Sequence, residues 1–232
     1  MRKYLFAGVL LTLGFAGLSA FQFEADARRT SVSERLYLIT VEDKLSKEEQ
    51  AGQYAFDRAH SYLGFKIKHM GLVDVPGGFT DFAGDIDFKP GDLEDSTVAF
   101  TAQVTSIDTR VDARDNHLRS KDFFEVETYP EMRFKSTAIE KQGDRLLVKG
   151  NLTIKDVTKE IEIPVSIYGP IKDQRGAVRM GVVGSTVINR RDFNVNYGGN
   201  LPNGTAVLAD NVAIDIQVES VKKKEEKADA GN

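Results

Sequence analysis

Apolar and polar residues alternate along most of the chain after residue 53. Phe65, Ile67 and His69 occupy every second position of one segment, with Lys66 and Lys68 between them. Successive side chains of a strand point to opposite faces, so this pattern predicts half-buried β-strands. The segments that show it, about eight or nine strands in all, are 54–57, 65–69, 82–88, 98–105, 132–136, 148–155, 160–167, 180–188 and 212–219.

Turn residues separate these predicted strands, and helical periodicity is nearly confined to residues 112–121. The turn signals are Pro76-Gly-Gly78, Lys89-Pro-Gly-Asp92, Gln142-Gly-Asp144, Asp156-Val-Thr158 and Gly169-Pro170. Short antiparallel strands at this spacing form either a sandwich or a barrel. A closed barrel has no edge strands to protect, and an eight-stranded barrel has room for one small ligand. The fold is therefore predicted to be all-β.

The side chains predicted to point inward mix large aromatic rings with very small residues. The aromatic members are Phe65, Phe82, Phe88, Phe100 and Phe134, and the small members are Gly84, Ala102, Gly150 and Gly184. Small residues at inward positions either leave room for a channel or mark bends and bulges at the corners of the barrel. The residues alone favour neither interpretation.

The first twenty residues have the layout of a secretory signal peptide. Arg2 and Lys3 precede an apolar run, Tyr4–Leu18, which ends in the small residues Ser19 and Ala20. Because the run is short for a membrane span, we expect residues 1–20 to be removed and the protein to be periplasmic or secreted. An uncleaved N-terminal anchor is the alternative. No cysteine follows the run, which excludes a lipoprotein anchor.

The regions on either side of the predicted barrel are polar and charged. Residues 21–53 are expected to form a charged extension, a spacer or a loosely attached helix, in which 36–41 can add a short strand. The barrel domain is expected over 54–221. Residues 222–232 are expected to be a disordered tail, because their charges are of both signs and nearly cancel.

Charge and cysteine content narrow the classes of function. The chain carries 31 basic and 35 acidic residues, and loss of the leader would remove two of the basic ones. A mildly acidic surface without a basic stripe argues against nucleic acid and against general attraction to anionic headgroups. The chain has no cysteine, so its stability must come from burial and hydrogen bonding, and thiolate chemistry is excluded.

A charged, aromatic-ended insert, residues 114–130, interrupts the strands. Its aromatic residues Phe123, Phe124 and Tyr129 are expected to fold back over the barrel opening as a lid, which must move to admit a long ligand. Arg114 has two interpretations. It either serves an anion site, to which its planar fork is suited, or it belongs to an internal network in which Asp115 or Asp108 neutralises it and pins the insert to the barrel.

The three histidines show no metal-ligand spacing, and no metal site is expected. His69 shares a face with Phe65, so it is either a core histidine bonded to a backbone carbonyl or a polar contact for a headgroup at the barrel mouth. His60 precedes Ser61, but no nucleophile elbow is present. The polar residues 57–61 are instead expected to close the end of the first strand by bonding to backbone.

Four segments together resemble the YceI-like family. They are Asp57-Arg-Ala-His-Ser61, Phe65-Lys-Ile-Lys-His-Met-Gly71, residues 114–130 and Asn151-Leu-Thr-Ile-Lys-Asp-Val-Thr-Lys159. The family usually has Gly where Asn194 follows Asn189-Arg-Arg-Asp-Phe193, and Asn is the best substitute where backbone φ is positive. The glycine-rich residues 196–204 lack the end of a phosphate loop and are predicted to be a flexible connection.

The resemblance implies an extended eight-stranded antiparallel lipocalin-like barrel with a short helical insert or lid near 112–121. It also implies a carrier for polyisoprenoid or related lipids, with no enzymatic activity and no cofactor. We expect headgroup contacts from His69, Arg114 and His117. The residues expected to line the pocket are Phe65, Ile67, His69, Phe82, Ile86, Phe100, Val104, Phe123, Phe124, Phe134, Leu152, Ile154, Ile163, Val165, Val182 and Phe193.

Several questions of function stay open at this point. An isoprenyl phosphate, a quinone and a fatty-acyl amide would all suit such a lining. Membrane contact is expected only transiently, nucleic acid is not expected as a partner, and a homodimer is left open. The competing classes are a ligand-free stress-response or interaction module and a lipid hydrolase, which would need convergent titratable groups in the pocket.

Overall fold

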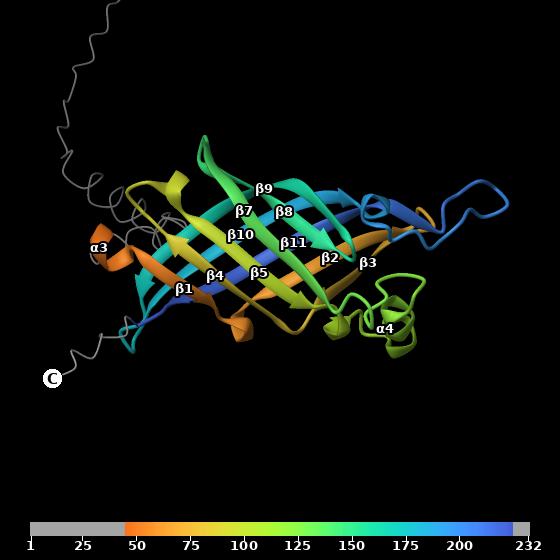
Figure 1. The fold of residues 1–232 in the computed structure, drawn as a ribbon, viewed down its shortest axis with the longest axis horizontal. Helices are drawn as coiled ribbons and strands as arrows, with labels where there is room; N and C mark the ends of the chain where they lie inside the picture. The colour runs from red at the N-terminus through yellow and green to blue at the C-terminus, as the bar shows by residue number, and fades with distance from the viewer. Residues whose placement is uncertain (1–44, 225–232) are drawn as a thin grey trace, which may run out of the picture. The chain divides into compact units, whose positions relative to one another are not determined.

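The computed structural model describes residues 45–224, whose strands wrap into one closed barrel (Figure 1). The strands are β1 (Gly52–Phe56), β2 (Tyr62–His69), β3 (Val73–Phe79), β4 (Phe82–Phe88), β5 (Thr97–Gln103), β6 (Ile107–Asp108), β7 (Glu131–Gln142), β8 (Arg145–Ile154), β9 (Val157–Lys172), β10 (Val178–Asn189) and β11 (Leu208–Lys222). The helices are α3 (Lys47–Gln50) and α4 (Asp112–Arg119), and the 3-10 turns are η1 (Arg58–His60), η2 (Leu93–Asp95), η3 (Val104–Ser106) and η4 (Arg190–Phe193).

Three of the barrel strands are each broken into two pieces, so the 11 strands build an eight-stranded ring. Turn η1 separates β1 from β2, residues Thr80 and Asp81 separate β3 from β4, and η3 separates β5 from β6. Strand β11 pairs with both β1 and β2, which closes the ring, and every pairing between the strands is antiparallel. The predicted eight-stranded barrel and its helical insert near 112–121 are confirmed. Two of the predicted turns are wrong, because Pro76-Gly-Gly78 lies within β3 and Gly169-Pro170 lies within β9.

The break between β1 and β2 is held by polar side chains. Asp57 caps η1, since its Oδ1 accepts a hydrogen bond from the Ala59 amide at 3.1 Å. The hydroxyl of Ser61 donates to the carbonyl oxygen of Asp57 at 2.7 Å and accepts from the amide of Glu219 at 3.0 Å. The prediction that residues 57–61 close the first strand by bonding to backbone is confirmed.

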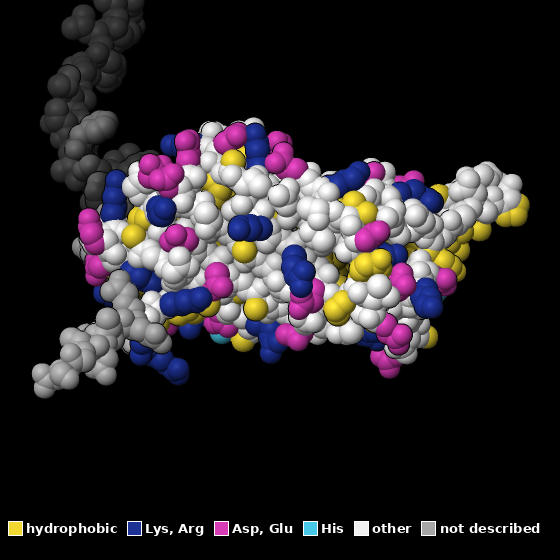
Figure 2. Space-filling view, in the orientation of Figure 1, with side chains coloured by type: hydrophobic (Ala, Val, Ile, Leu, Met, Phe, Trp, Pro, Cys, Tyr) yellow, Lys and Arg dark blue, Asp and Glu magenta, His cyan; other side chains and the backbone are white. Residues whose placement is uncertain are grey.

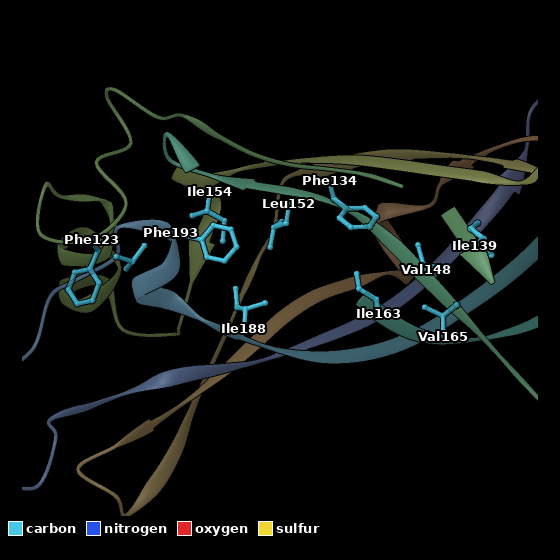
Figure 3. Close-up of a cluster of buried hydrophobic side chains, with 11 residues drawn as sticks. Phe123, Phe134, Ile139, Val148, Leu152, Ile154, Ile163, Val165, Ile188 and Phe193 are labelled. Atoms are coloured by element: carbon cyan, nitrogen blue, oxygen red, sulfur yellow. The ribbon is translucent and has the colours of Figure 1, made fainter. Parts of the chain in front are cut away.

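The two faces of the strands carry different side chains. Figure 2 shows charged side chains of both signs interspersed over the visible outer face. Inside, the largest cluster of buried apolar side chains runs along the barrel, from Phe123 at the end near α4 through Phe134 to Val165 (Figure 3). Strands of this kind alternate inward apolar and outward polar residues, as the sequence pattern predicts.

The inward glycines do not leave an open channel, and one of them, Gly150, lies at a bulge: the register of β7 and β8 shifts between Ser136, which pairs with Gly150, and Ala138. A Cβ at Gly150 would come within 2.6 Å of the Lys135 carbonyl oxygen and 2.7 Å of Phe134 Cε2. A Cβ at Gly84 would lie 2.5 Å from Phe56 Cε2. The space above these glycines is therefore filled by neighbouring rings, so they seat aromatic side chains instead of leaving an open channel.

The described ends of the chain meet at the end of the barrel opposite to α4 (Figure 1). Helix α3 begins with a capping box between Ser46 and Glu49. Lys222 Nζ, from the last strand, donates to the Glu49 carbonyl oxygen at 2.8 Å. The predicted leader, the 36–41 strand and most of the predicted tail lie outside the described residues. Within residues 45–224, neither helix has the length and apolar character that crossing a membrane requires.

Candidate ligand-binding cavity

A cavity of about 350 Å³ lies in the barrel beside α4, and its wall is mostly apolar. Its wall combines inward side chains of the strands with α4 and the segment that follows it. The side chains on the wall that carry polar groups are His69, Thr109, Arg114, His117, Arg190 and Tyr197. Polar atoms form only a small part of the cavity surface, so these side chains border an interior that is almost entirely apolar.

A second cavity, of about 80 Å³, lies deeper in the barrel. Its wall includes Phe56, Ile86, Val148 and Met180, and among residues 45–224 only Ser96 adds a polar side chain to it. Five residues line both cavities and form the belt between them: Leu63, Phe100, Phe134, Ile163 and Ile216.

Most of the residues expected to line a pocket lie on one of these two walls. On the large cavity are Phe65, Ile67, His69, Phe100, Phe123, Phe124, Phe134, Leu152, Ile154, Ile163 and Phe193, together with Arg114 and His117. On the small cavity are Ile86, Val165 and Val182. Whether each of them contacts a ligand stays a prediction.

Phe82 and Val104 differ from the expectation, because neither lines either cavity. Phe82 is buried against Leu63, Ala102 and Val218 in a separate apolar cluster, where barrel side chains fill the space. Val104 begins the turn η3, so the alternation of β5 ends one residue before it. Val104 is buried at the end of the strand and not on the cavity wall.

Other wall residues were not among the expected ones. Met132, Ile161, Ile188, Val212, Ile214 and Ile216 line the large cavity. Their alternation with polar neighbours was a sufficient signal, since each shares a face with apolar residues of its own strand. Arg190 and Tyr197 come from η4 and the loop after it, where no periodic signal exists.

Arg114, Thr109 and Asp115 form a hydrogen-bonded chain at the base of α4. Asp115 is 5% exposed, and its Oδ1 accepts from the Thr109 amide at 3.0 Å and the Thr109 hydroxyl at 2.5 Å. Arg114 donates from Nε to the Thr109 hydroxyl oxygen at 2.7 Å and from Nη2 to the Thr109 carbonyl oxygen at 2.8 Å. The expected internal network is present, but Thr109 stands between the charges: no carboxylate of residues 45–224 forms an ion pair with Arg114 within 4.0 Å.

The lid is fastened to the barrel by further contacts. Arg119, at the end of α4, donates to the carbonyl oxygens of Thr105 and Ile107, both at 2.8 Å. After α4, Phe123 is buried in the main apolar cluster and Phe124 packs against it. Phe123 and Phe124 thus fold back over the cavity as expected of the lid, whereas Tyr129 does not line the cavity.

His117 lies in an aromatic cluster that joins the lid to the β10–β11 loop. Its ring stands edge-on to Phe123, with centroids 5.1 Å apart, and to Tyr197, at 4.7 Å. Its Nε2 lies 2.7 Å from Asp122 Oδ2. Any opening of the lid away from the loop would have to separate these rings.

Arg190 shapes the loop at the same end of the barrel. Its buried guanidinium donates to the carbonyl oxygens of Val195 and Tyr197, both at 2.7 Å, and burial lowers its pKa. Asn194 has φ 58°, which confirms the expected positive φ at this position. The loop predicted as a flexible connection contains a hairpin-like bridge between Asn200 and Ala206.

Comparison with known proteins identifies the family of this barrel. The profile of the YceI-like domain matches residues 54–220. The chain belongs to the YceI-like family. A UPF0312 protein of Vibrio parahaemolyticus is 35% identical over 177 residues, which cover 75% of this chain and 89% of the relative. The resemblance seen in the sequence motifs is thus confirmed.

Solved structures show the same YceI-like fold. The Campylobacter jejuni YceI protein is 34% identical, with a TM-score of 0.58, over 72% of this chain and 96% of that one. A structure described as a polyisoprenoid binding domain from Saccharophagus degradans matches with a TM-score of 0.55 and 17% identity, over 73% of this chain and 98% of that one. At that identity, the second likeness shows the fold alone.

The other two histidines of this YceI-like barrel have separate surroundings. The His69 ring lies on the wall of the large cavity and forms no hydrogen bond within residues 45–224. His60 pairs with Asp57, and both lie near Glu219 in a cluster whose ligand atoms are within 4.8 Å of one another. Arg179 donates to Asp57 at 2.9 Å and to Glu219 at 2.5 Å, so a guanidinium already neutralises these carboxylates.

Proposed function

We propose that this protein is an exported, non-catalytic carrier that holds the tail of a long-chain amphiphile in the large cavity. The observation that carries the proposal is an apolar cavity of about 350 Å³ with Arg114 among the residues of its wall. Protein cavities that hold small molecules are mostly apolar, with a few polar groups that fix orientation. The apolar wall suits the tail of such a ligand, and Arg114 suits its polar end.

The energetics favour a tail over water in this space. Each methylene removed from water contributes roughly 0.8 kcal/mol. The wall near β8 and β9 offers aliphatic side chains such as Leu152, Ile154 and Ile161, which give water no hydrogen bonds. A hydrocarbon tail therefore gains from entry while water does not.

The polar end of the ligand is proposed to lie near His69, Arg114 and His117. Arg114 keeps its charge close to the cavity while Asp115 balances it only through the Thr109 hydroxyl. An isoprenyl phosphate, a quinone or a fatty-acyl amide each has a polar end that a guanidinium can bind. The Saccharophagus degradans structure, described as a polyisoprenoid binding domain, supports the isoprenoid class at the level of the shared fold.

The carrier proposal is tested by isolating the protein from its natural compartment without detergent. Native mass spectrometry should show an added mass of a few hundred daltons that solvent extraction releases and fragmentation identifies as an amphiphile. The mass of the protein itself should correspond to a chain without residues 1–20. A bare protein mass, together with no uptake of added fatty acids, would contradict the proposal.

The absence of turnover is tested separately at His69. We expect His69→Ala to weaken ligand binding and to leave the bound lipid chemically unchanged in both proteins. Hydrolysis of an ester lipid by the wild type that disappears in His69→Ala would replace the carrier by a hydrolase.

A further inference from the structure

The belt between the two cavities is built by residues that face one another in register. Phe100 of β5 pairs directly with Phe134 of β7, and Leu63 of β2 pairs with Ile216 of β11. Ile163 of β9 completes the set that lines both cavities. Side chains from opposite walls of the barrel therefore close the lumen at one level.

Phe134 is the least exposed member of this belt. Its ring stacks on that of Phe100, with centroids 5.6 Å apart and planes inclined by 20°. It is 3% exposed, and Gly150 on β8 leaves the room in which the ring lies. Figure 3 shows Phe134 between Leu152 and Ile154 on one side and Val148 and Val165 on the other.

Glycines at the level of the belt make the closure sterically feasible. Gly84 pairs with Phe100, and Gly184 pairs with Ile216. A Cβ at Gly184 would lie 3.3 Å from Cγ2 of the belt residue Ile163, whereas a Cβ at Gly84 would meet Phe56, which lines the small cavity. Gly184 thus leaves room for Ile163 in the belt, and Gly84 leaves room for Phe56 beside it.

The small cavity beyond the belt suits the end of a hydrocarbon chain. Its wall is formed by residues such as Ile86, Val148, Met180 and Val182. Apolar cavities of this kind stay empty of water and bind apolar groups instead. With the belt closed, however, a tail in the large cavity cannot reach it.

We propose that the stacked pair Phe100 and Phe134 sets the longest tail that the large cavity accepts, and that the small cavity is a subsite for longer tails when the pair is opened. This inference rests on the proposed carrier function. In the wild type, added methylenes improve binding until the tail meets the stack. Without the Phe134 ring, the two cavities join and the tail extends into the second one.

The test measures the binding of saturated fatty acids that differ by two carbons, by displacement of an apolar fluorescent dye. Wild-type affinity should rise with tail length, by about fourfold for each methylene, or ~0.8 kcal/mol, and then stop rising. In Phe134→Ala the rise should continue to longer acids. Phe134→Leu keeps a branched apolar side chain and should extend the limit less. It can replace Phe134→Ala in the test if that variant does not fold.

Two further variants separate the belt from a general loosening of the core. Met180→Ala enlarges the small cavity without touching the belt, so it should keep the wild-type limit. Val182→Phe, added to Phe134→Ala, fills the small cavity and should restore that limit. If the folded Phe134→Ala protein shows the same limit of tail length as the wild type, the inference is wrong, while the carrier proposal is unaffected. A wild type that binds none of the acids overturns the carrier proposal and the limit with it.

Discussion

The ring of Phe134 lies directly over Gly150, its neighbour on the adjacent strand. A Cβ at position 150 would meet both that ring, at 2.7 Å from Cε2, and the Lys135 carbonyl oxygen, at 2.6 Å. The carbonyl belongs to the backbone of a paired strand and cannot turn away as a flexible side chain would. The absence of a side chain at Gly150 is therefore a packing requirement of the barrel interior.

We expect Gly150→Ala to destabilise the protein by about 1–3 kcal/mol, the usual range for overpacking a close-packed core. The measurement is the free energy of unfolding in urea, compared with Gly199→Ala. A Cβ at Gly199 would meet no other atom within 4 Å, so this control should change stability little. Equal effects of the two substitutions would show that the contact with Phe134 is not what excludes a side chain.

Gly150 shows which features of the barrel interior can be predicted from the sequence and which cannot. Alternation placed Phe134 and Leu152 on the inner face, because a half-buried strand has a period of two. The same pattern could not predict which ring lies over Gly150, since that depends on the register between β7 and β8. Alternation also failed at Val104, where the strand ends in a 3-10 turn.

The network at the lid was harder to predict than the lid itself. The charged insert and its aromatic end were sufficient to predict a helical cover over the barrel. Thr109 carries no signal of its own, yet it bonds to both Arg114 and Asp115. Its role arises only when the turn after β6 brings it beneath the first turn of α4, so sequence reasoning paired the arginine directly with an aspartate.

We expect Asp115→Ala to loosen the lid, because the buried amide and hydroxyl of Thr109 would lose their acceptor. An unsatisfied buried group costs about 1–3 kcal/mol. Urea unfolding should show this loss, and amide hydrogen exchange should accelerate in α4. Asp112→Ala is the matched control, since Asp112 is exposed in the same first turn and should cost only about 0.3–1 kcal/mol. Unchanged exchange in Asp115→Ala would contradict the anchoring role.

The pair of His60 and Asp57 should make stability depend on pH near neutrality. His60 Nδ1 lies 2.9 Å from Asp57 Oδ2, and this hydrogen bond raises the pKa of His60 above its ordinary 6.5. The folded protein then holds this proton more tightly than the unfolded chain. The contribution of this pair to the free energy of unfolding is full below pH 6.5. It is lost as the pH rises through the pKa of His60 in the folded protein.

We therefore expect the free energy of unfolding to fall slightly as the pH rises from 6.5 through the pKa of His60 in the folded protein. The ring is mostly exposed, so the effect should be small and sensitive to salt. Urea titrations across the window should show the decline in the wild type and a weaker one in His60→Gln. The same decline in both proteins would assign the pH dependence to other groups.

Arg114 should discriminate between charged and neutral polar ends of a ligand. Arg114 is among the residues of the cavity wall, and its guanidinium forms no ion pair with a carboxylate of residues 45–224, which leaves it available to an anionic end. We expect Arg114→Gln to weaken binding of a fatty acid by about tenfold or more, since a hydrogen bond to a charged group contributes roughly 1.5–3 kcal/mol. Binding of the fatty alcohol with the same tail should change much less.

The comparison of acid with alcohol also separates recognition from damage to the lid. Arg114 donates to Thr109, so its replacement disturbs the insert for both ligands, whereas only the acid loses a charge partner. Arg110→Gln removes a nearby guanidinium that does not line the cavity and should leave both affinities near those of the wild type. If Arg114→Gln weakens acid and alcohol equally, Arg114 supports the lid and the polar end of the ligand lies elsewhere.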